Sequence, residues 1–218
     1  MYTVVLNDQL FPYPVGKCVC VGRNYAAHAT ELNNPVPSQP LLFIKPADAA
    51  VPMAPQISIP SQYGSVHHEL EIAVVLQHRL KNATESQVRA AIAGVGLALD
   101  LTLRDVQEQL KKQGHPWEAA KAFDGSSPLS NFVSIEQVAD LANIEFSLKR
   151  NGETQQQGNS KDMLFAIVPL IAYMSSIFTL NPGDVILTGT PVGVGPLETA
   201  DILELQLAEH IAIETVVV

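Results

Sequence analysis

The chain has 218 residues, of which 47% are hydrophobic and 16% charged, so it has ample apolar material for a folded core and little sign of disorder. Acidic residues outnumber basic ones by 22 to 13 without any cluster of Lys and Arg, which removes the electrostatic basis for nucleic-acid binding. No apolar run approaches the roughly 18 residues that span a bilayer, and no leader is evident, so we expect no membrane association, a cytoplasmic location and one domain over residues 1–218.

Short β-branched segments recur along most of the chain and predict a strand-rich fold. The predicted strands are residues 2–6, 17–21, 41–44, 71–76, 95–99, 144–149, 184–187, 202–207 and 211–217. We expect Cys18 and Cys20, within the second strand, to point to opposite faces and to remain unpaired thiols, as is usual in the cytoplasm. The Asn151-Gly152 pair predicts a tight hairpin turn.

Helices are predicted at fewer places. Four candidates begin or run at residues 84–94, 103–113, 134 onward and 162–178. The first opens with capping-box spacing and should end at a left-handed Gly94, and the second should end at Gly114. Pro169 should kink or split the fourth helix.

Two carboxylates one residue apart stand at the start of an apolar strand. Glu69 and Glu71 would share one face, where like charges repel unless a cation lies between them. Asp100, which ends the apolar run 95–99, is the candidate third ligand, and three carboxylates suit Mg²⁺ or Mn²⁺. The alternatives are an exposed strand start for the glutamates and an N-cap role for Asp100 in the helix that follows it.

A second group of residues predicts acid–base chemistry. His28 and Glu31 are three apart, which on a helical turn brings them within hydrogen-bonding reach and makes a general base with its orienting carboxylate. A surface His beside a helix-stabilising acid is the alternative. Arg104 and Gln107 follow Asp100 at four and seven residues, so a helix that starts at Asp100 would place both beside the metal. A solvated helix face is the alternative for Arg104.

Three further features adjoin these residues in the sequence. The glycine-rich segment 187–195 lacks the ending of a phosphate-binding loop, so we expect a tight turn that offers Thr190 and backbone N–H groups to a ligand. His67 and His68 flank the acidic pair without the spacing of a cupin site and are expected in the core or just behind the ligands. Lys121 by itself indicates no function.

Six motifs together resemble the fumarylacetoacetate hydrolase family, and within it the short single-domain acylpyruvase-like members. The motifs are residues 21–25 followed by His28 and Glu31, then 43–46, 67–71, 99–107, 121–124 and 187–191, in the family's order across nearly the whole chain. The resemblance implies an α+β, β-rich fold built on a rolled mixed β-sheet with few short helices, usually in a homodimer.

The resemblance also implies roles for individual residues. Glu69, Glu71 and Asp100 would bind Mg²⁺ or Mn²⁺, and His28 with Glu31 would activate water on a mobile lid helix around residues 25–33. Lys121 would stabilise negative charge, and the substrate pocket would be lined by Arg23, Arg104, Gln107 and Thr190. Residues 32–35 depart from the basic or polar stretch that acylpyruvase-like proteins can carry after the His–Glu pair.

The implied function is metal-dependent hydrolysis of a C–C bond in 2,4-dioxo acids of the acylpyruvate or fumarylpyruvate type, which yields pyruvate and a carboxylic acid. Its partner would be a small 2-oxo acid. Oxaloacetate decarboxylation or tautomerisation, and isomerisation of an oxo-dienoate, need the same parts and remain open. A divalent-metal-binding protein without catalysis is the alternative of another class.

Overall fold

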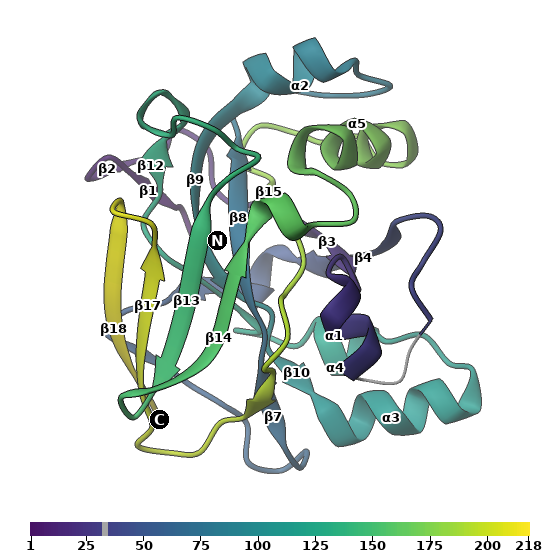
Figure 1. Ribbon diagram of the computed structural model, residues 1–218, viewed down its shortest axis with the longest axis vertical. Coiled ribbons are helices and arrows are strands. Elements are labelled where there is room, and N and C mark those ends of the chain that lie inside the picture. The colour runs from purple at the N-terminus through teal and green to yellow at the C-terminus, as the bar shows by residue number, and fades with distance from the viewer. Residues whose placement is uncertain (32–34) are drawn as a thin grey trace.

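Strands dominate the structure, a computed structural model that describes residues 1–31 and 35–218 (Figure 1). The largest sheet has eight strands: in spatial order β4 (Leu41–Pro46), β3 (Lys17–Gly22), β15 (Val185–Leu187), β8 (Leu70–Leu76), β9 (Ile92–Leu99), β11 (Ser127–Leu129) and β5 (Ala50–Pro52), with β12 (Val133–Ser134) also paired to β9. The pairs β3–β15 and β5–β11 are parallel and the others antiparallel, so the sheet is mixed.

A second sheet has five strands: in spatial order β14 (Glu153–Asn159), β13 (Glu145–Arg150), β17 (Ile202–Leu207), β18 (Ile211–Val217) and β6 (Gln56–Ile57). The predicted hairpin joins β13 to β14, and Asn151 and Gly152 both take the positive φ values, 54° and 81°, that such a turn requires. Two small sheets complete the fold, one of β10 (Thr102–Leu103), β7 (Val66–His68) and β16 (Gly195–Pro196), the other of β1 (Val5–Leu6) and β2 (Gln9–Leu10).

The core lies on both faces of the large sheet because its central strands are apolar on both sides. Ile72 and Val74 of β8 belong to the same buried cluster as Phe146 of β13 and Leu205 of β17, so the two large sheets pack together through this face. Val75 belongs to a second cluster on the opposite face, under the N-terminal segment. The expected α+β, β-rich fold with a mixed sheet is confirmed.

Five α-helices occur among the described residues: α1 (Ala26–Glu31), α2 (Glu85–Ala91), α3 (Arg104–Gln113), α4 (Glu118–Lys121) and α5 (Ile167–Ile177). Helices α2 and α5 lie together at one end of the molecule, whereas α1, α3 and α4 gather at the side of the sheets (Figure 1). No helix within residues 1–31 and 35–218 is long and apolar enough to cross a membrane.

Two of the predicted helix boundaries are confirmed, whereas the predictions for Gly94 and Pro169 are wrong. The capping box on Thr84 is present and Gly114 ends α3 in the left-handed conformation, as predicted. Gly94 does not end α2, because the chain passes directly into β9, where a Cβ at Gly94 would lie 2.5 Å from the carbonyl oxygen of Val133. Pro169 causes no kink, since α5 begins only at Ile167 and the first turn needs no intrahelical N–H donor.

Three other predictions need correction. The helix expected from Ser134 is a single 3-10 turn, η2 (Ile135–Gln137), and the predicted strand 2–6 is reduced to β1. Cys18 and Cys20 lie in the same buried cluster on one face of β3, because residues two apart in a strand share a face. Both are free thiols, as expected.

Candidate active site and metal centre

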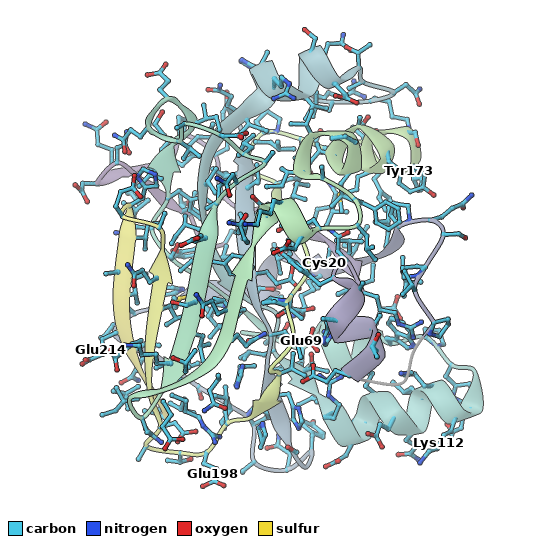
Figure 2. The ribbon with its side chains drawn as sticks, viewed as in Figure 1. Cys20, Glu69, Lys112, Tyr173, Glu198 and Glu214 are labelled. Carbon is cyan, nitrogen blue, oxygen red and sulfur yellow. The ribbon has the colours of Figure 1, made fainter. Side chains whose placement is uncertain are left out.

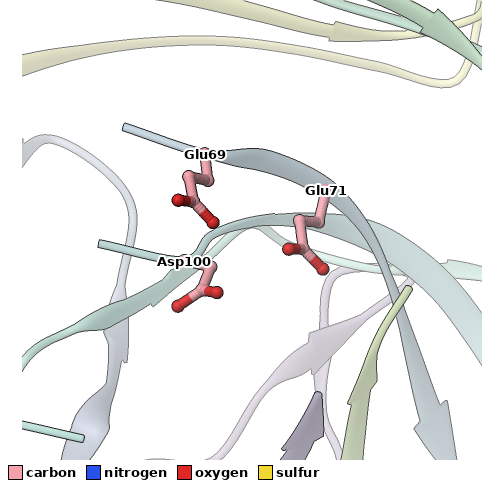
Figure 3. Close-up of side chains that lie close together, drawn as sticks. All are labelled: Glu69, Glu71 and Asp100. Carbon is pink, nitrogen blue, oxygen red and sulfur yellow. The ribbon is translucent and has the colours of Figure 1, made fainter. Parts of the chain in front are cut away.

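The three predicted metal ligands converge at the ends of two paired strands. Glu69 lies between β7 and β8, Glu71 is the second residue of β8, and Asp100 follows β9 directly. Strands β8 and β9 run antiparallel with Leu70 opposite Leu99, so Asp100 lies beside Glu69. The backbone N–H of Asp100 donates to the backbone carbonyl of Glu69 at 2.8 Å. One ligand oxygen from each carboxyl lies within 4.8 Å of the others, and Figure 3 shows the three groups converging.

The alternative interpretations of these carboxylates do not fit the structure. Glu69, Glu71 and Asp100 are 6%, 1% and 1% exposed, so none is a solvated strand start. Figure 2 likewise shows Glu69 near the middle of the molecule and Glu214 at its outer edge. Asp100 does not cap α3, whose N-cap residue is Leu103, and the helix predicted over 103–113 runs from Arg104 to Gln113, after the short strand β10.

Cationic side chains compensate two of the three carboxylates. Lys121 Nζ lies 2.8 Å from Glu69 Oε2 and 2.7 Å from Asp100 Oδ2, and Arg104 Nη2 lies 2.6 Å from Glu69 Oε1. Burial acts to raise the pKa of Glu69, but Lys121 and Arg104 outweigh it and hold that pKa below its usual range. Burial likewise acts to lower the pKa of Lys121, and Asp100 with Glu69 outweighs it and raises that pKa.

Glu71 has no such compensation in the part of the chain that the structure describes. Among the described residues it accepts one hydrogen bond, from the backbone N–H of Gly189 at 2.5 Å, and burial together with Asp100 raises its pKa well above the usual value. Lys45 Nζ forms a buried ion pair with Asp100 Oδ1 at 2.5 Å, so each oxygen of Asp100 is paired with an ammonium. The buried Glu71 carboxyl has no cationic partner among the described residues and lies beside two other carboxylates, which fits a site for a hard divalent ion such as Mg²⁺ or Mn²⁺.

The predicted His–Glu pair is formed within α1. His28 Nδ1 lies 3.2 Å from Glu31 Oε2, and Glu31 Oε1 accepts a hydrogen bond from the Gly193 N–H at 3.0 Å. His28 is only 4% exposed, so it is not a surface histidine. The expected lid helix around residues 25–33 corresponds to α1, although residues 32–34 lie outside the described residues.

One narrow cavity, with about 40 Å³ of open space, collects nearly all the predicted site residues. Glu31 is the exception, because it lies behind His28. The predicted residues that line the cavity are Arg23, His28, Glu69, Glu71, Asp100, Arg104, Gln107, Lys121 and Thr190. Arg104 Nη1 donates to Gln107 Oε1 at 2.7 Å across one turn of α3, so the two side chains share a face as predicted.

Several further residues lie at this site that the sequence did not predict. Lys45 is fully buried behind Asp100, and Lys111 and Trp117 line the cavity with Leu41 and Phe43. A lysine within the apolar run 41–46 was a signal for Lys45, since a buried ammonium needs an anion. Trp117 is the chain's only tryptophan, but nothing local in the sequence predicts that it lines one cavity with Phe43 and Glu69.

Of the two histidines beside the acidic pair, His68 is a core group and His67 is partly buried. His68 is fully buried, and its Nδ1 lies 2.9 Å from Gln156 Oε1. Burial, with Arg104, lowers the pKa of His67 to about 4, and burial also lowers the pKa of His68. Both rings are therefore neutral near pH 7.

Comparison with known proteins identifies the class of this fold and site. The family described as Fumarylacetoacetate (FAA) hydrolase C-terminal matches residues 17–218. The chain therefore belongs to the fumarylacetoacetate hydrolase family, as the motifs predicted, and it is a short member of that family.

Particular relatives are similar over most of their length. The chain is 56% identical to oxaloacetate tautomerase YcgM of Escherichia coli K12, over 92% of each protein. It is 46% identical to the mitochondrial oxaloacetate tautomerase FAHD1 of Bos taurus, over 88% of this chain and 86% of the relative. A solved structure of fumarylpyruvate hydrolase from Pseudomonas aeruginosa in complex with Mn²⁺ and pyruvate is 34% identical, with a TM-score of 0.92 over 100% of this chain and 97% of that one.

Proposed function

We propose that this protein is a metal-dependent oxaloacetate tautomerase that interconverts the keto and enol forms of the acid. The observation that carries the proposal is that one narrow cavity joins three convergent carboxylates, the Lys121 ammonium and the imidazole of His28, whose Nδ1 contacts Glu31. The two tautomerase relatives, at 56% and 46% identity, favour this reaction over the hydrolysis that we expected first, because the fumarylpyruvate hydrolase is only 34% identical.

The side chains supply the parts that tautomerisation needs. Glu69, Glu71 and Asp100 would hold Mg²⁺ or Mn²⁺, which when bound supplies Lewis-acid polarisation of the 2-oxo group. His28, oriented by Glu31 through Nδ1, takes the C3 proton of the keto form on Nε2 while the C3–H electron pair forms the C2–C3 double bond. The Lys121 ammonium stabilises the negative charge that develops on the C2 oxygen, and transfer of the proton to that oxygen completes the enol.

The charge of the cavity favours a substrate with two carboxylates. Four cationic side chains line it, those of Arg23, Arg104, Lys111 and Lys121, against three carboxylates. A divalent cation would add to this positive excess, which suits a dianion such as oxaloacetate better than the monoanion acetylpyruvate. Arg23 also takes a left-handed backbone, φ 58°, which is uncommon for a non-glycine residue and marks a candidate functional position.

Hydrolysis of acylpyruvates or fumarylpyruvate is the second candidate. The His28–Glu31 pair favours it, since the same imidazole can deprotonate water, and it would release pyruvate and a carboxylic acid. Three other possibilities would use the same metal ligands: oxaloacetate decarboxylation, isomerisation of an oxo-dienoate, and metal binding without turnover. The reaction products distinguish them.

The test is to follow the enol absorbance of oxaloacetate and of acetylpyruvate with Mn²⁺, while total oxaloacetate, pyruvate and CO₂ are quantified. We expect faster loss of the oxaloacetate enol with no loss of total oxaloacetate. His28→Ala should slow this by about 10²–10⁴-fold. His78→Ala, which removes an exposed histidine, should leave the rate unchanged.

The products decide between the alternatives. Pyruvate and CO₂ in step with the absorbance loss would instead indicate a decarboxylase, and pyruvate with acetate from acetylpyruvate a hydrolase. Mn²⁺ binding with no turnover of either acid would favour a metal-binding protein without catalysis. Conversion of an oxo-dienoate, with neither acid turned over, would instead indicate an isomerase.

A further inference from the structure

Gln156 joins the two halves of the site from behind. It lies in β14 of the five-stranded sheet and is fully buried. Its Oε1 accepts from the Leu70 N–H and from His68 Nδ1, both at 2.9 Å. Its Nε2 donates to Thr190 Oγ1 at 2.7 Å and to the Pro191 carbonyl at 3.0 Å. One amide thus uses all its main hydrogen-bonding positions to connect the Glu69–Glu71 segment with the loop at Thr190.

Two backbone groups fix which way this amide points. The Leu70 N–H can only donate, so it must face the oxygen of Gln156, and the Pro191 carbonyl can only accept, so it must face the nitrogen. Rotation of the amide by 180° would break both contacts and leave buried groups unpaired. The remaining hydrogen of Nε2 therefore points at Thr190 Oγ1.

The polarity of the Thr190 hydroxyl follows from this network. The hydroxyl accepts from Gln156, and its single hydrogen is donated to the Leu70 carbonyl at 2.8 Å. A threonine hydroxyl has one donor and two acceptor positions, so one lone pair remains. Because Thr190 lines the cavity, that lone pair is what it can offer to a ligand.

We propose that Gln156 is a positioning residue that holds the Thr190 hydroxyl as a hydrogen-bond acceptor facing the cavity. The Thr190 hydroxyl would then accept a hydrogen bond from a hydroxyl group at the 2-position of a small acid. This assignment rests on the function proposed above, in which that hydroxyl is the enol of the substrate. The cavity thereby distinguishes a 2-hydroxyl, which can donate to Thr190, from a 2-oxo group, which cannot.

The first test uses substitutions on both sides of the Gln156–Thr190 contact. Gln156→Glu retains the oxygen that faces Leu70 but replaces the donor to Thr190 with an acceptor, and the exposed neighbour Gln157→Glu is its matched control. We expect kcat for tautomerisation to fall at least ~10-fold in Gln156→Glu and in Thr190→Val, with Mn²⁺ affinity within ~3-fold of the control, and Thr190→Ser to retain most activity. The double variant should be no slower than the slower single variant, since both remove one interaction.

A binding measurement separates this assignment from the proposed reaction. Titration calorimetry of Mn²⁺-loaded protein with lactate and with pyruvate compares a 2-hydroxyl with a 2-oxo group and requires no turnover. In Thr190→Val and in Gln156→Glu the ratio of the lactate Kd to the pyruvate Kd should rise by about 5–10-fold. If Gln156→Glu does not fold, the comparison of Thr190→Val with Thr190→Ser gives the same test.

The outcomes are distinct. An unchanged lactate-to-pyruvate ratio in Thr190→Val, or kinetic losses of Gln156→Glu and Thr190→Val that multiply in the double variant, would overturn the assignment. A shifted ratio in a protein that does not tautomerise oxaloacetate would support the assignment and reject the proposed reaction.

Discussion

Lys121 is the residue whose positive charge compensates two of the three carboxylates of the site. It is buried and contacts both Glu69 and Asp100, at 2.8 and 2.7 Å. Removal of one member of such a buried group leaves charges without a partner in a medium that solvates them poorly. Catalysis and the stability of the metal-free protein therefore depend on the same side chain.

We predict that Lys121→Met lowers the free energy of unfolding of the metal-free protein by about 3–5 kcal/mol. Mn²⁺ should restore more stability to this variant than to the wild type, because a cation can compensate the carboxylates that the ammonium leaves. Urea unfolding in EDTA and in Mn²⁺ measures both effects. Lys112→Met, an exposed change in α3, is the control and should shift stability by under about 0.5 kcal/mol. Equal stability of Lys121→Met and wild type in EDTA would contradict the prediction.

The buried thiols of β3 predict that the stability of the fold depends on pH. Burial raises the pKa of Cys18 to about 12, and burial also raises the pKa of Cys20 well above the usual value. Because the unfolded thiols ionise near 9.0, the folded state holds more protons between pH 9.0 and about 12, and these groups lose their stabilising contribution as pH rises through that range.

We therefore predict no reaction of either thiol with a disulfide reagent in the native protein near pH 8, since the thiolate is the nucleophile. Both thiols should react once the protein is unfolded in urea. A count of released chromophore per chain measures this, and one rapidly reacting thiol in the native protein would contradict the burial of β3.

At the scale of elements, the loop between β15 and β16 anchors the His–Glu helix. The Gly193 N–H donates to Glu31, and Gly193 has φ 98° with a Cβ position only 1.9 Å from the Gln155 carbonyl oxygen. Gly114 at the end of α3 also has a positive φ, 68°, but no atom lies within 4 Å of its Cβ position. A Cβ would strain the backbone at either glycine, but only at Gly193 would it also displace the loop.

Gly114→Ala should cost about 1–2 kcal/mol of stability through its left-handed backbone and leave turnover unchanged. Gly193→Ala should cost more than Gly114→Ala and in addition lower kcat/KM at least ~10-fold, because the loop must move away from Glu31. Mn²⁺ affinity should change little in either variant. Turnover of Gly193→Ala equal to that of Gly114→Ala would show that the contact of α1 with this loop does not matter for catalysis.

Elements were predictable from the sequence where the deciding forces are local. The capping box of α2, the Gly114 end of α3 and the Asn151-Gly152 hairpin depend on a few adjacent residues, and all three are present. Predictions failed where distant contacts decide, as at Gly94, which pairs in a sheet with residues near Val133. Tertiary context overrides propensity at such positions.

At the scale of the whole molecule, the site is assembled from segments between residues 21 and 190. Residue types and strand alternation predicted the three carboxylates, and local spacing predicted the His28–Glu31 pair, because each signal lies within a few residues. Lys45 and Gln156 were not predicted, since the order of strands in the two large sheets brings them there. Lys111 and Trp117 were not predicted because their place depends on how α3 and α4 pack beside the sheet.

Metal binding should stabilise the whole fold. A ligand that binds only the folded state adds about 2.7 kcal/mol at 100 times its Kd, so Mn²⁺ should raise the Tm of the wild type in a concentration-dependent way. Glu71→Gln should abolish this rise, and the exposed change Glu214→Gln should preserve it. A Tm that Mn²⁺ raises equally in all three proteins would place the metal elsewhere. The homodimer and the cytoplasmic location remain predictions.

The most direct test of the central claim is the rate at which oxaloacetate interconverts between enol and keto forms, followed by ultraviolet absorbance with total oxaloacetate assayed in parallel. We predict acceleration by the wild type with Mn²⁺, loss of that acceleration in EDTA and in Glu71→Ala, and conservation of total oxaloacetate throughout. Acceleration that survives Glu71→Ala, or that is absent from the metal-loaded wild type, would contradict a tautomerase that acts at Glu69, Glu71 and Asp100.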